Sequence, residues 1–310
     1  MPSSRASVFG EAEDFQAALS ADGVAGMLVT GSGQFRARLT QLRLERLRLS
    51  AVEEARSRVA FITVPSGMVL VSFAIKGGPS PVWGGISIGP GEIITFGPGQ
   101  RLHARTAGAC HWGAIQVPDR QLVDYGRILG GAAFVVSPAA RWQPSRAARN
   151  ELHDLHRAGI RMAEARAGAV TDPQAAHGLE HQVLHALIEC LSERREEETA
   201  TGRRHRDMLA RFEDLLGAEP LPRKAAICMA LGVSNRLLNE CCKEHLGMGP
   251  IRYSHLRAMQ QVHRALLSGT PDTTRVSEIA RQHGFCALGR LAANYRGVYS
   301  ELPSATLRRN

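Results

Sequence analysis

The chain has 310 residues, 44% of them hydrophobic and 22% charged, which is typical of a globular protein of about two domains. No stretch approaches the about 18 consecutive apolar residues that a membrane span requires. The first fifteen residues, MPSSRASVFGEAEDF, lack the apolar core of a targeting peptide and include Glu11, Glu13 and Asp14. We therefore expect a cytoplasmic protein with no membrane partner.

The positive charge is concentrated near the C-terminus. Of the net charge of +9, residues 203–310 carry +8 (17 Lys and Arg against 9 Asp and Glu), and residues 1–202 carry +1 (21 against 20). A basic segment attached to a neutral one indicates a polyanionic partner for the basic part.

Residues 34–117 are expected to form strands. Short apolar or alternating runs (FRARL, VAFITV, MVLVSFAI, ISIG and EIITF) are separated by Pro and Gly breaks. Many short strands at this spacing predict an antiparallel sandwich or a small barrel.

Helical patterns follow Pro118. We predict helices over residues 119–130, 145–167 and 173–191, the last with Leu179, Val183, Leu187 and Cys190 at helical spacing. The last two form a pair whose apolar face is expected to pack on the β-domain or on a second subunit. The polar run SERREEETATG, residues 192–202, has no large apolar side chain and is the best linker candidate.

Two helix-turn-helix patterns lie beyond this run. In the first, a short helix ends at Gly232 and a second restarts in GVSNRLLNECCKEHLG, with Ser234 as the capping residue. In the second, a helix from Thr274 breaks at Gly284 and another starts in GFCALGRLAANYRGVY. We expect Leu237, Leu238, Leu288, Leu291 and Tyr295 in the core.

A continuous amphipathic helix over residues 250–267 connects the two units. Its apolar side is expected to hold Ile251, Leu256, Met259, Val262 and Leu266. Such a helix would keep the two units at a fixed separation.

The segments LGVSNRLLNECCKEHLGMGPIRYSHLRAM, VSEIARQHGF and LGRLAANYRGVYSELPSATLRR resemble the AraC/XylS family of transcriptional regulators, in the family's order and spacing. GPGEIITFGPGQRLHART also resembles the cupin-like barrels of the family's sensory domains. The resemblance implies an α+β chain: a cupin-like antiparallel β-barrel with appended helices (residues 1–195), a linker (196–204) and an all-α DNA-binding domain of about seven helices (205–310). Ser300 departs from the glycine that is usual before the final Pro-Ser segment.

The resemblance also implies partners and contact residues. The partners are double-stranded DNA, a second copy of the chain, and, as further candidates, RNA polymerase and a small-molecule effector; no cofactor is expected. The candidate DNA-contacting residues are Ser234, Asn235, Arg236, Asn239 and Glu240 in the first unit, and Arg290 and Asn294 in the second. Arg pairs with guanine, Asn with adenine, and Glu accepts from cytosine. Gly289 and Ala293 stand where some members of that family carry polar side chains that contact bases. The second unit is therefore expected to rely more on phosphate contacts and DNA shape.

The β-domain raises an alternative, a cupin-like metal-dependent enzyme acting on a small molecule. Such enzymes need two or three His and a carboxylate around one ion. Here the H-x-H pair is missing, because Arg105 stands two residues after His103, where the second histidine would be, and His111 lies on a later strand. We therefore expect no catalysis, and take Trp83, His103, Arg105 and Trp112 as candidate effector contacts.

The histidines and cysteines are further candidate sites. His177, His181 and His185 share one helical face, with His153 and His156 nearby, and could chelate zinc; we favour a polar stripe at a helix or dimer contact. The six cysteines form no CxxC pair, so we expect free thiols acting as core residues. A non-specific nucleic-acid packaging protein is the remaining alternative, and the Asn and Arg side chains of the first unit argue against it.

Overall fold

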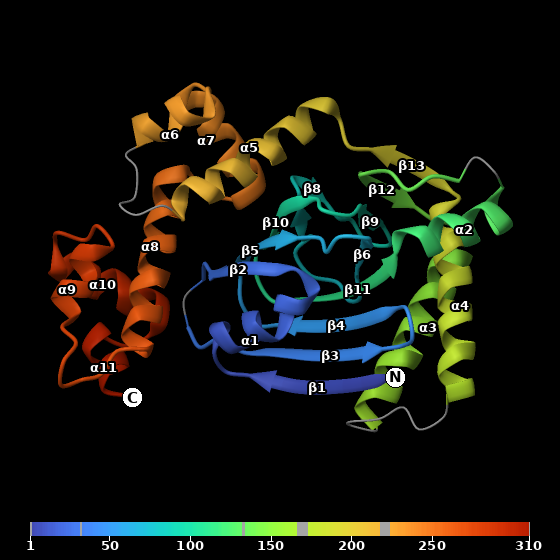
Figure 1. Cartoon of the computed structure of the whole chain (residues 1–310), viewed down its shortest axis with the longest axis horizontal. Coiled ribbons are helices and arrows are strands. Elements are labelled where there is room, and N and C mark those ends of the chain that lie inside the picture. Colours follow the sequence, from blue (N-terminus) through green and yellow to red (C-terminus); the bar gives the residue numbers. More distant parts are fainter. Residues whose placement is uncertain (1, 32, 132–133, 166–172, 218–223, 310) are drawn as a thin grey trace.

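The computed structural model describes residues 2–31, 33–131, 134–165, 173–217 and 224–309. Its N-terminal part is built on β-strands with helices, and its C-terminal part is helical (Figure 1). Among the described helices, none has both the length and the apolar character needed to cross a bilayer.

In the part of the chain that the structure describes, the strands form two antiparallel sheets. The larger has eight strands, in the order β1 (Ser3–Phe9), β3 (Ala37–Arg43), β4 (Arg48–Glu54), β11 (Cys110–Pro118), β6 (Met68–Ala74), β9 (Ile93–Phe96), β12 (Ala139–Gln143) and β13 (Arg194–Glu197). The smaller has five, in the order β2 (Val24–Val29), β5 (Arg58–Thr63), β10 (Arg101–Thr106), β7 (Val82–Trp83) and β8 (Ile86–Ser87).

The two sheets share a core. Side chains that alternate along the strands, such as Leu39, Val52, Ile62 and Leu102, meet in one buried cluster together with Phe15 of α1 (Ala12–Leu19). The expected antiparallel β-domain is therefore confirmed. The expected single barrel is not: no strand pairing among the described residues joins the two sheets into one closed ladder.

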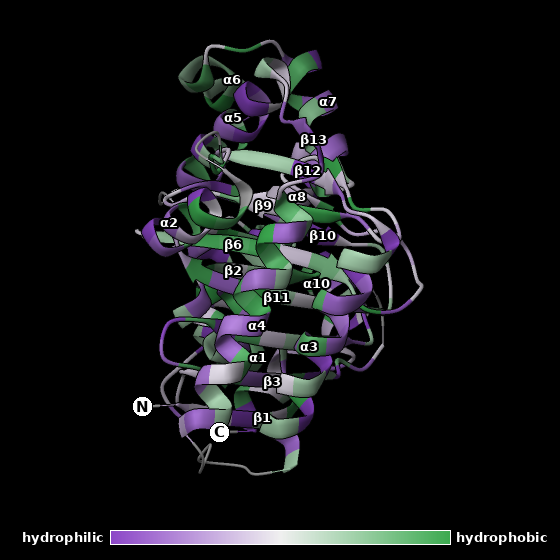
Figure 2. Cartoon of the chain, turned by 90° about the vertical axis from the view of Figure 1, so that its right-hand side faces the viewer, coloured by the Kyte–Doolittle hydropathy of each residue, from purple (hydrophilic) through white to green (hydrophobic). Residues whose placement is uncertain are grey.

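Three helices lie on the other face of the larger sheet: α2 (Asp119–Gly130), α3 (Arg146–Ala165) and α4 (Pro173–Leu191). Val69, Val71 and Phe73 of β6 point toward them, while Leu70 points into the core between the sheets. A strand buried on both faces explains the apolar run MVLVSFA, and Figure 2 shows hydrophobic residues on the strands behind α3 and α4.

These helices agree with the sequence predictions. The helices predicted at 119–130 and 173–191 have those bounds, and the one predicted at 145–167 is observed at 146–165, with its last two positions outside the described residues. The apolar face of the α3–α4 pair is buried against the chain's own sheet by Leu152, Ile160, Val183 and Leu187. That face is therefore not free to hold a second subunit.

Among the described residues, seven helices follow β13: α5 (Ala200–Leu216), α6 (Lys224–Leu231), α7 (Asn235–Leu246), α8 (Pro250–Leu267), α9 (Val276–Gln282), α10 (Leu288–Tyr299) and α11 (Pro303–Arg308). They contain two small cores. One joins α5, α6 and α7 around Phe212, Leu238 and Cys242, and the other joins α8, α9, α10 and α11 around Val262, Leu291 and Tyr295.

The segment expected to be a linker, residues 196–204, has regular structure. Glu196 and Glu197 end β13, whose residues pair with β12, and α5 begins at Ala200. All four side chains of β13 are exposed, so the strand exists through backbone pairing at the edge of the sheet rather than through an apolar pattern.

Candidate nucleic-acid interface and an N-terminal cavity

The first helix-turn-helix unit is α6, a turn at Gly232 and α7. Gly232 has φ +68°, in the left-handed region that favours glycine. Ser234 then adopts an extended conformation, and its hydroxyl oxygen accepts a hydrogen bond from the Leu237 amide at 3.1 Å. This cap sets the start of α7, as expected from the sequence.

The polar candidates of the first unit lie together at the start of α7. Ser234, Asn235, Arg236 and Glu240 are exposed, and 88% of the Arg236 side chain is exposed. Arg236 Nε donates to Glu240 Oε1 at 2.8 Å, and Asn239 Nδ2 donates to Asn235 Oδ1 at 2.8 Å. Because these bonds lie within one exposed helix face, the side chains can exchange partners without unfolding the helix.

The second unit is α9, a turn at Gly284 with φ +83°, and α10. Arg290 and Asn294 are both exposed on α10. Leu291 and Tyr295 are buried as expected, but the prediction for Leu288 was wrong, since it is 38% exposed. Leu288 is the first residue of α10, where the helix has not yet reached the core of its unit.

Asn294 lines a hollow of about 870 Å³ between α10, α8 and the N-terminal part. The other walls of this hollow include Thr30, Gly31, Arg252 and His255. The second unit's polar candidate therefore lies next to the end of β2, whereas the candidates on α7 are open to solvent.

The helix between the units is α8, with the predicted bounds. Its 18 residues give it a length of about 27 Å at about 1.5 Å per residue. That length is comparable to the about 34 Å between successive turns of the major groove. Met259, Val262 and Leu266 are buried, and Leu256 is half-buried. The prediction for Ile251 was wrong, because it lies in the first turn and is 57% exposed.

The four candidate effector contacts do not line one cavity. Trp83 and Trp112 are buried between the two sheets, with ring centroids 5.5 Å apart, and Trp112 Nε1 donates to Glu54 Oε1 at 2.6 Å. His103 and Arg105 point the other way along β10, toward α5 and the end of α7. The alternation with the buried Leu102 and Ala104 was the sequence signal for this orientation.

His103 belongs to a buried polar cluster that joins β10, α5 and α8. Its Nε2 lies 3.3 Å from Glu213 Oε2, which also accepts from the Tyr253 hydroxyl at 2.7 Å, and Arg257 Nη2 lies 2.7 Å from Glu213 Oε1. Burial by itself raises the pKa of Glu213, but the His103 hydrogen bond and the Arg257 charge outweigh it and hold that pKa below 4.5.

Sequence reasoning missed Glu213, Tyr253 and Arg257, because each fits an ordinary helical pattern. An acidic residue on the apolar side of α5, next to Phe212 and Leu216, was the available signal.

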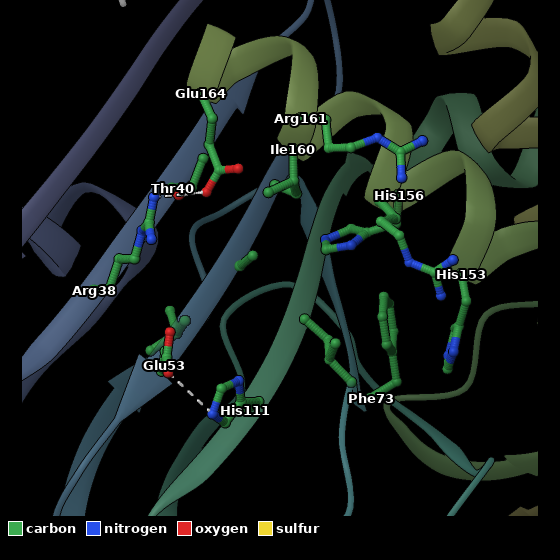
Figure 3. A pocket seen from close by; sticks show the side chains of 14 residues that line it. Arg38, Thr40, Glu53, Phe73, His111, His153, His156, Ile160, Arg161 and Glu164 are labelled. Atoms are coloured by element: carbon green, nitrogen blue, oxygen red, sulfur yellow. Dashed lines mark hydrogen bonds and ion pairs between the residues drawn. The ribbon is translucent and has the colours of Figure 1, made fainter.

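The N-terminal part also contains a cavity of about 210 Å³ between α3 and the larger sheet (Figure 3). Ile160, Arg161 and Glu164 reach it from α3, as do His153 and His156. The opposite wall is formed by strand residues: Arg38, Thr40, Glu53, Phe73 and His111.

Several of these side chains already have partners. His111 Nε2 lies 3.3 Å from Glu53 Oε1, and Arg38 Nη2 lies 3.1 Å from Glu164 Oε1. Burial lowers the pKa of His156 to about 4, so this ring is neutral, and its Nε2 lies 3.1 Å from the Ser50 carbonyl oxygen. His103 and His111 thus lie apart, one beside Glu213 and the other beside Glu53.

The histidine stripe on α4 and the cysteines are the remaining candidate sites. His177, His181 and His185 are exposed on α4, and the Nε2 atoms of His177 and His181 lie 3.0 Å apart. All six cysteines are free thiols, of which Cys110, Cys190, Cys241 and Cys242 are buried. Burial raises the pKa of these four thiols, to about 11 for Cys241 and about 12 for the others, so they behave as core residues.

A helix-turn-helix domain family matches residues 227–309. The XylDLEGF operon transcriptional activator of Pseudomonas putida is 36% identical over 88 residues, which are 28% of this chain and 26% of that protein. A probable thc operon regulatory protein of Rhodococcus erythropolis is 34% identical over 84 residues, 27% of this chain and 25% of that protein. The match thus spans about a quarter of the length of these curated relatives.

Among solved structures, the AraC-like transcriptional activator CuxR is similar at 15% identity and a TM-score of 0.46, over 85% of this chain and 96% of CuxR. A structure of ToxT from Vibrio cholerae is similar at 11% identity and a TM-score of 0.31, over 90% of this chain and 98% of ToxT.

The matched segment begins within α6 and ends just after α11, so it contains both helix-turn-helix units and the α8 helix between them. Residues 227–309 therefore form a helix-turn-helix domain that is similar to the matched parts of these transcriptional regulators.

Proposed function

We propose that the protein is a sequence-specific DNA-binding transcriptional regulator that places α7 and α10 in neighbouring major grooves. The observation that carries this proposal is the pair of helix-turn-helix units held by one 18-residue helix, with polar side chains exposed at the start of α7. The excess of +8 in residues 203–310 supports phosphate contacts around these helices.

In this proposal, α7 reads bases directly. Arg236 pairs with guanine, Asn235 and Asn239 recognise adenine, Glu240 accepts from cytosine, and Ser234 contacts the backbone or a base edge. The Arg236–Glu240 ion pair is solvent-exposed, so opening it on binding costs little. Arg290 and Asn294 of α10 contribute fewer base contacts, and the second unit depends more on phosphates and DNA shape.

Enrichment of duplexes from a random pool, with the full chain at physiological salt, tests the proposal. We expect a motif of two blocks about one helical turn apart. Arg236→Ala should leave folding unchanged and blur the first block, with a loss of about 1–3 kcal/mol of discrimination at one base pair. Arg127→Ala, an exposed arginine on α2, is the matched control and should keep the full motif.

Strong binding that is steeply salt-dependent but enriches no motif would instead indicate non-specific packaging of nucleic acid. That outcome would contradict the proposed function.

We further infer that the cupin-like N-terminal part binds a small effector and supports a homodimer. The cavity beneath α3 is the better-formed effector site, because Phe73 and Ile160 give it apolar walls and Arg161 a positive charge. Its about 210 Å³ fits a small organic anion. The dimer would use the outward, polar side of α3 and α4, since their apolar side is buried against the sheet.

Thermal shifts with a panel of small carboxylic acids test the effector site. We expect a stabilising acid whose effect is lost in Ile160→Trp, which fills the cavity, while Ile128→Trp on the exposed end of α2 keeps it. A shift that survives Ile160→Trp would place the effector elsewhere.

A further inference from the structure

We propose that His205, Glu244 and His245 form a binding site for one divalent transition-metal ion, with zinc the best fit. His205 lies on α5, and the other two residues lie in the last turn of α7. One ligand atom from each lies within 4.8 Å of the others, and no other group of three such side chains occurs among the described residues. Imidazole nitrogens and a carboxylate oxygen are ligands that zinc accepts.

His245 provides an independent reason to expect a ligand here. Its side chain is fully buried, and neither Nδ1 nor Nε2 has a hydrogen-bond partner. Buried polar groups in folded proteins are almost always satisfied, so an orphaned imidazole requires an explanation. A metal ion at the cluster would supply a partner for one of the two ring nitrogens.

The other two side chains have suitable geometry and give the ion access. His205 Nδ1 lies 3.3 Å from Glu244 Oε2, close to the about 3.4 Å between two ligands of a tetrahedral zinc ion at its usual bond lengths. Their side chains are 22% and 48% exposed, so an ion can enter from solvent while His245 closes the site from inside. Three protein ligands leave the fourth position to water.

The position of His245 is held from the N-terminal part. Gly85 packs against its ring so closely that a Cβ there would lie 2.6 Å from His245 Cε1. Gly85 precedes β8 in the turn after β7, so the ring touches the smaller sheet and α7 at once.

Two cations lie near the cluster and limit its affinity. The positive charges of Arg206 and Arg105 both act on the His245 ring. Arg206 Nη2 lies 3.3 Å from Glu198 Oε2, and this carboxylate offsets part of the Arg206 charge. The Glu244 carboxylate offsets part of the rest. We therefore expect a site that fills reversibly rather than a structural zinc that never leaves.

A metal ion here would join α5, the last turn of α7 and, through His245, the smaller sheet. Because α7 is the proposed base-reading helix, metal occupancy would change how firmly that helix is held against the N-terminal part. By linkage, metal would then alter DNA affinity, and DNA would alter metal affinity by the same factor. Only this consequence rests on the proposed function, whereas metal binding itself does not.

Cobalt titration of the metal-stripped full chain tests the site, because tetrahedral Co²⁺ gives a characteristic visible absorption. The exposed His177–His181 pair is a rival site, so the titration uses a background carrying His177→Ala and His181→Ala. In this background we expect one equivalent of Co²⁺, displaced by Zn²⁺. His205→Ala and Glu244→Gln should each weaken binding by at least about ten- to hundredfold.

His255→Ala on α8 is the matched control and should bind Co²⁺ like the background. Circular dichroism verifies that each variant is folded. A folded background protein that takes up no Co²⁺ or Zn²⁺ would overturn the proposal, as would an unchanged affinity in His205→Ala. Metal uptake and metal affinity are both measured without DNA, so their outcomes do not depend on whether the proposed function is correct.

Discussion

At the residue scale, Ser300 carries backbone strain that its position explains. It ends α10 with φ +62°, and it is the one non-glycine residue with positive φ among those the structure describes. A helix commonly ends in this left-handed conformation, and glycine adopts it without penalty. Ser300 stands where glycine is usual in the family that the sequence resembles, and the positive φ explains the preference for glycine at this position.

We expect Ser300→Gly to stabilise the protein by about 0.5–1 kcal/mol, since the relief of left-handed strain exceeds the added entropy of the unfolded glycine. Urea unfolding of the full chain measures this change. Ser304→Gly, inside α11, is the control and should instead destabilise by about 0.5–1 kcal/mol. A Ser300→Gly protein no more stable than the original would contradict the argument from strain.

At the scale of elements, Glu213 joins one strand and two helices that are far apart in the sequence. We expect Glu213→Gln to cost stability toward the lower end of about 3–5 kcal/mol, because it leaves Arg257 without its ion-pair partner while 17% of the Arg257 side chain remains exposed. Asp214→Asn is the control. Its pair with Arg101 lies at the surface, so it should cost at most about 1 kcal/mol.

The contribution of Glu213 to the stability of the fold depends on pH. Because the pKa of Glu213 is below 4.5 in the folded protein, its contribution to stability is complete above pH 4.5 and is lost as the pH falls through the folded-state pKa. The stability difference between the original protein and Glu213→Gln should therefore shrink below pH 4.5. Equal differences at pH 7 and pH 3.5 would show that the carboxylate charge contributes nothing.

At the scale of the whole molecule, the contact of Gly85 with His245 decides how closely α7 approaches the smaller sheet. Gly85 has φ +85°, and a Cβ there would lie 2.7 Å from His245 Nε2. Gly67 has a similar φ of +72° but no atom near the position of a Cβ. The two glycines thus share the same backbone requirement and differ in the contact alone.

We expect Gly67→Ala to destabilise by about 1–2 kcal/mol, from backbone strain alone. Gly85→Ala should cost more and should speed hydrogen exchange in the last turn of α7, because the added methyl group pushes His245 away. Thermal unfolding and exchange measured by mass spectrometry give both quantities. If the two variants behave alike, the packing of α7 on the sheet is looser than the structure indicates.

Other contacts between the two parts of the chain lie far from any sequence motif. Gln260 Nε2 of α8 donates to the Met27 carbonyl oxygen, and Leu28 and Val59 belong to the core of the first unit. Contacts of this kind join residues more than 100 positions apart, which explains why no local pattern predicted them.

The sequence by itself determined the elements whose information is local. The bounds of α2, α4 and α8 were correct because apolar spacing and flanking Pro or Gly residues act within a few positions. The cap at Ser234 and the turns at Gly232 and Gly284 were predictable for the same reason, and with them the helix-turn-helix domain. Two first-turn residues, Ile251 and Leu288, were wrongly expected to be buried, and Leu237 and Leu256 are half-buried.

Only the tertiary structure decided which surfaces meet. It pairs the polar β13 with β12 through backbone hydrogen bonds, keeps the strands as two sheets, and buries the apolar side of α3 and α4 within the chain. It also turns His103 and Arg105 toward α5 and the end of α7, and so assembles Glu213, Tyr253 and Arg257, as well as the His245 cluster. Periodicity says that a side chain faces inward or outward, but the element that covers it is chosen by packing across the whole chain.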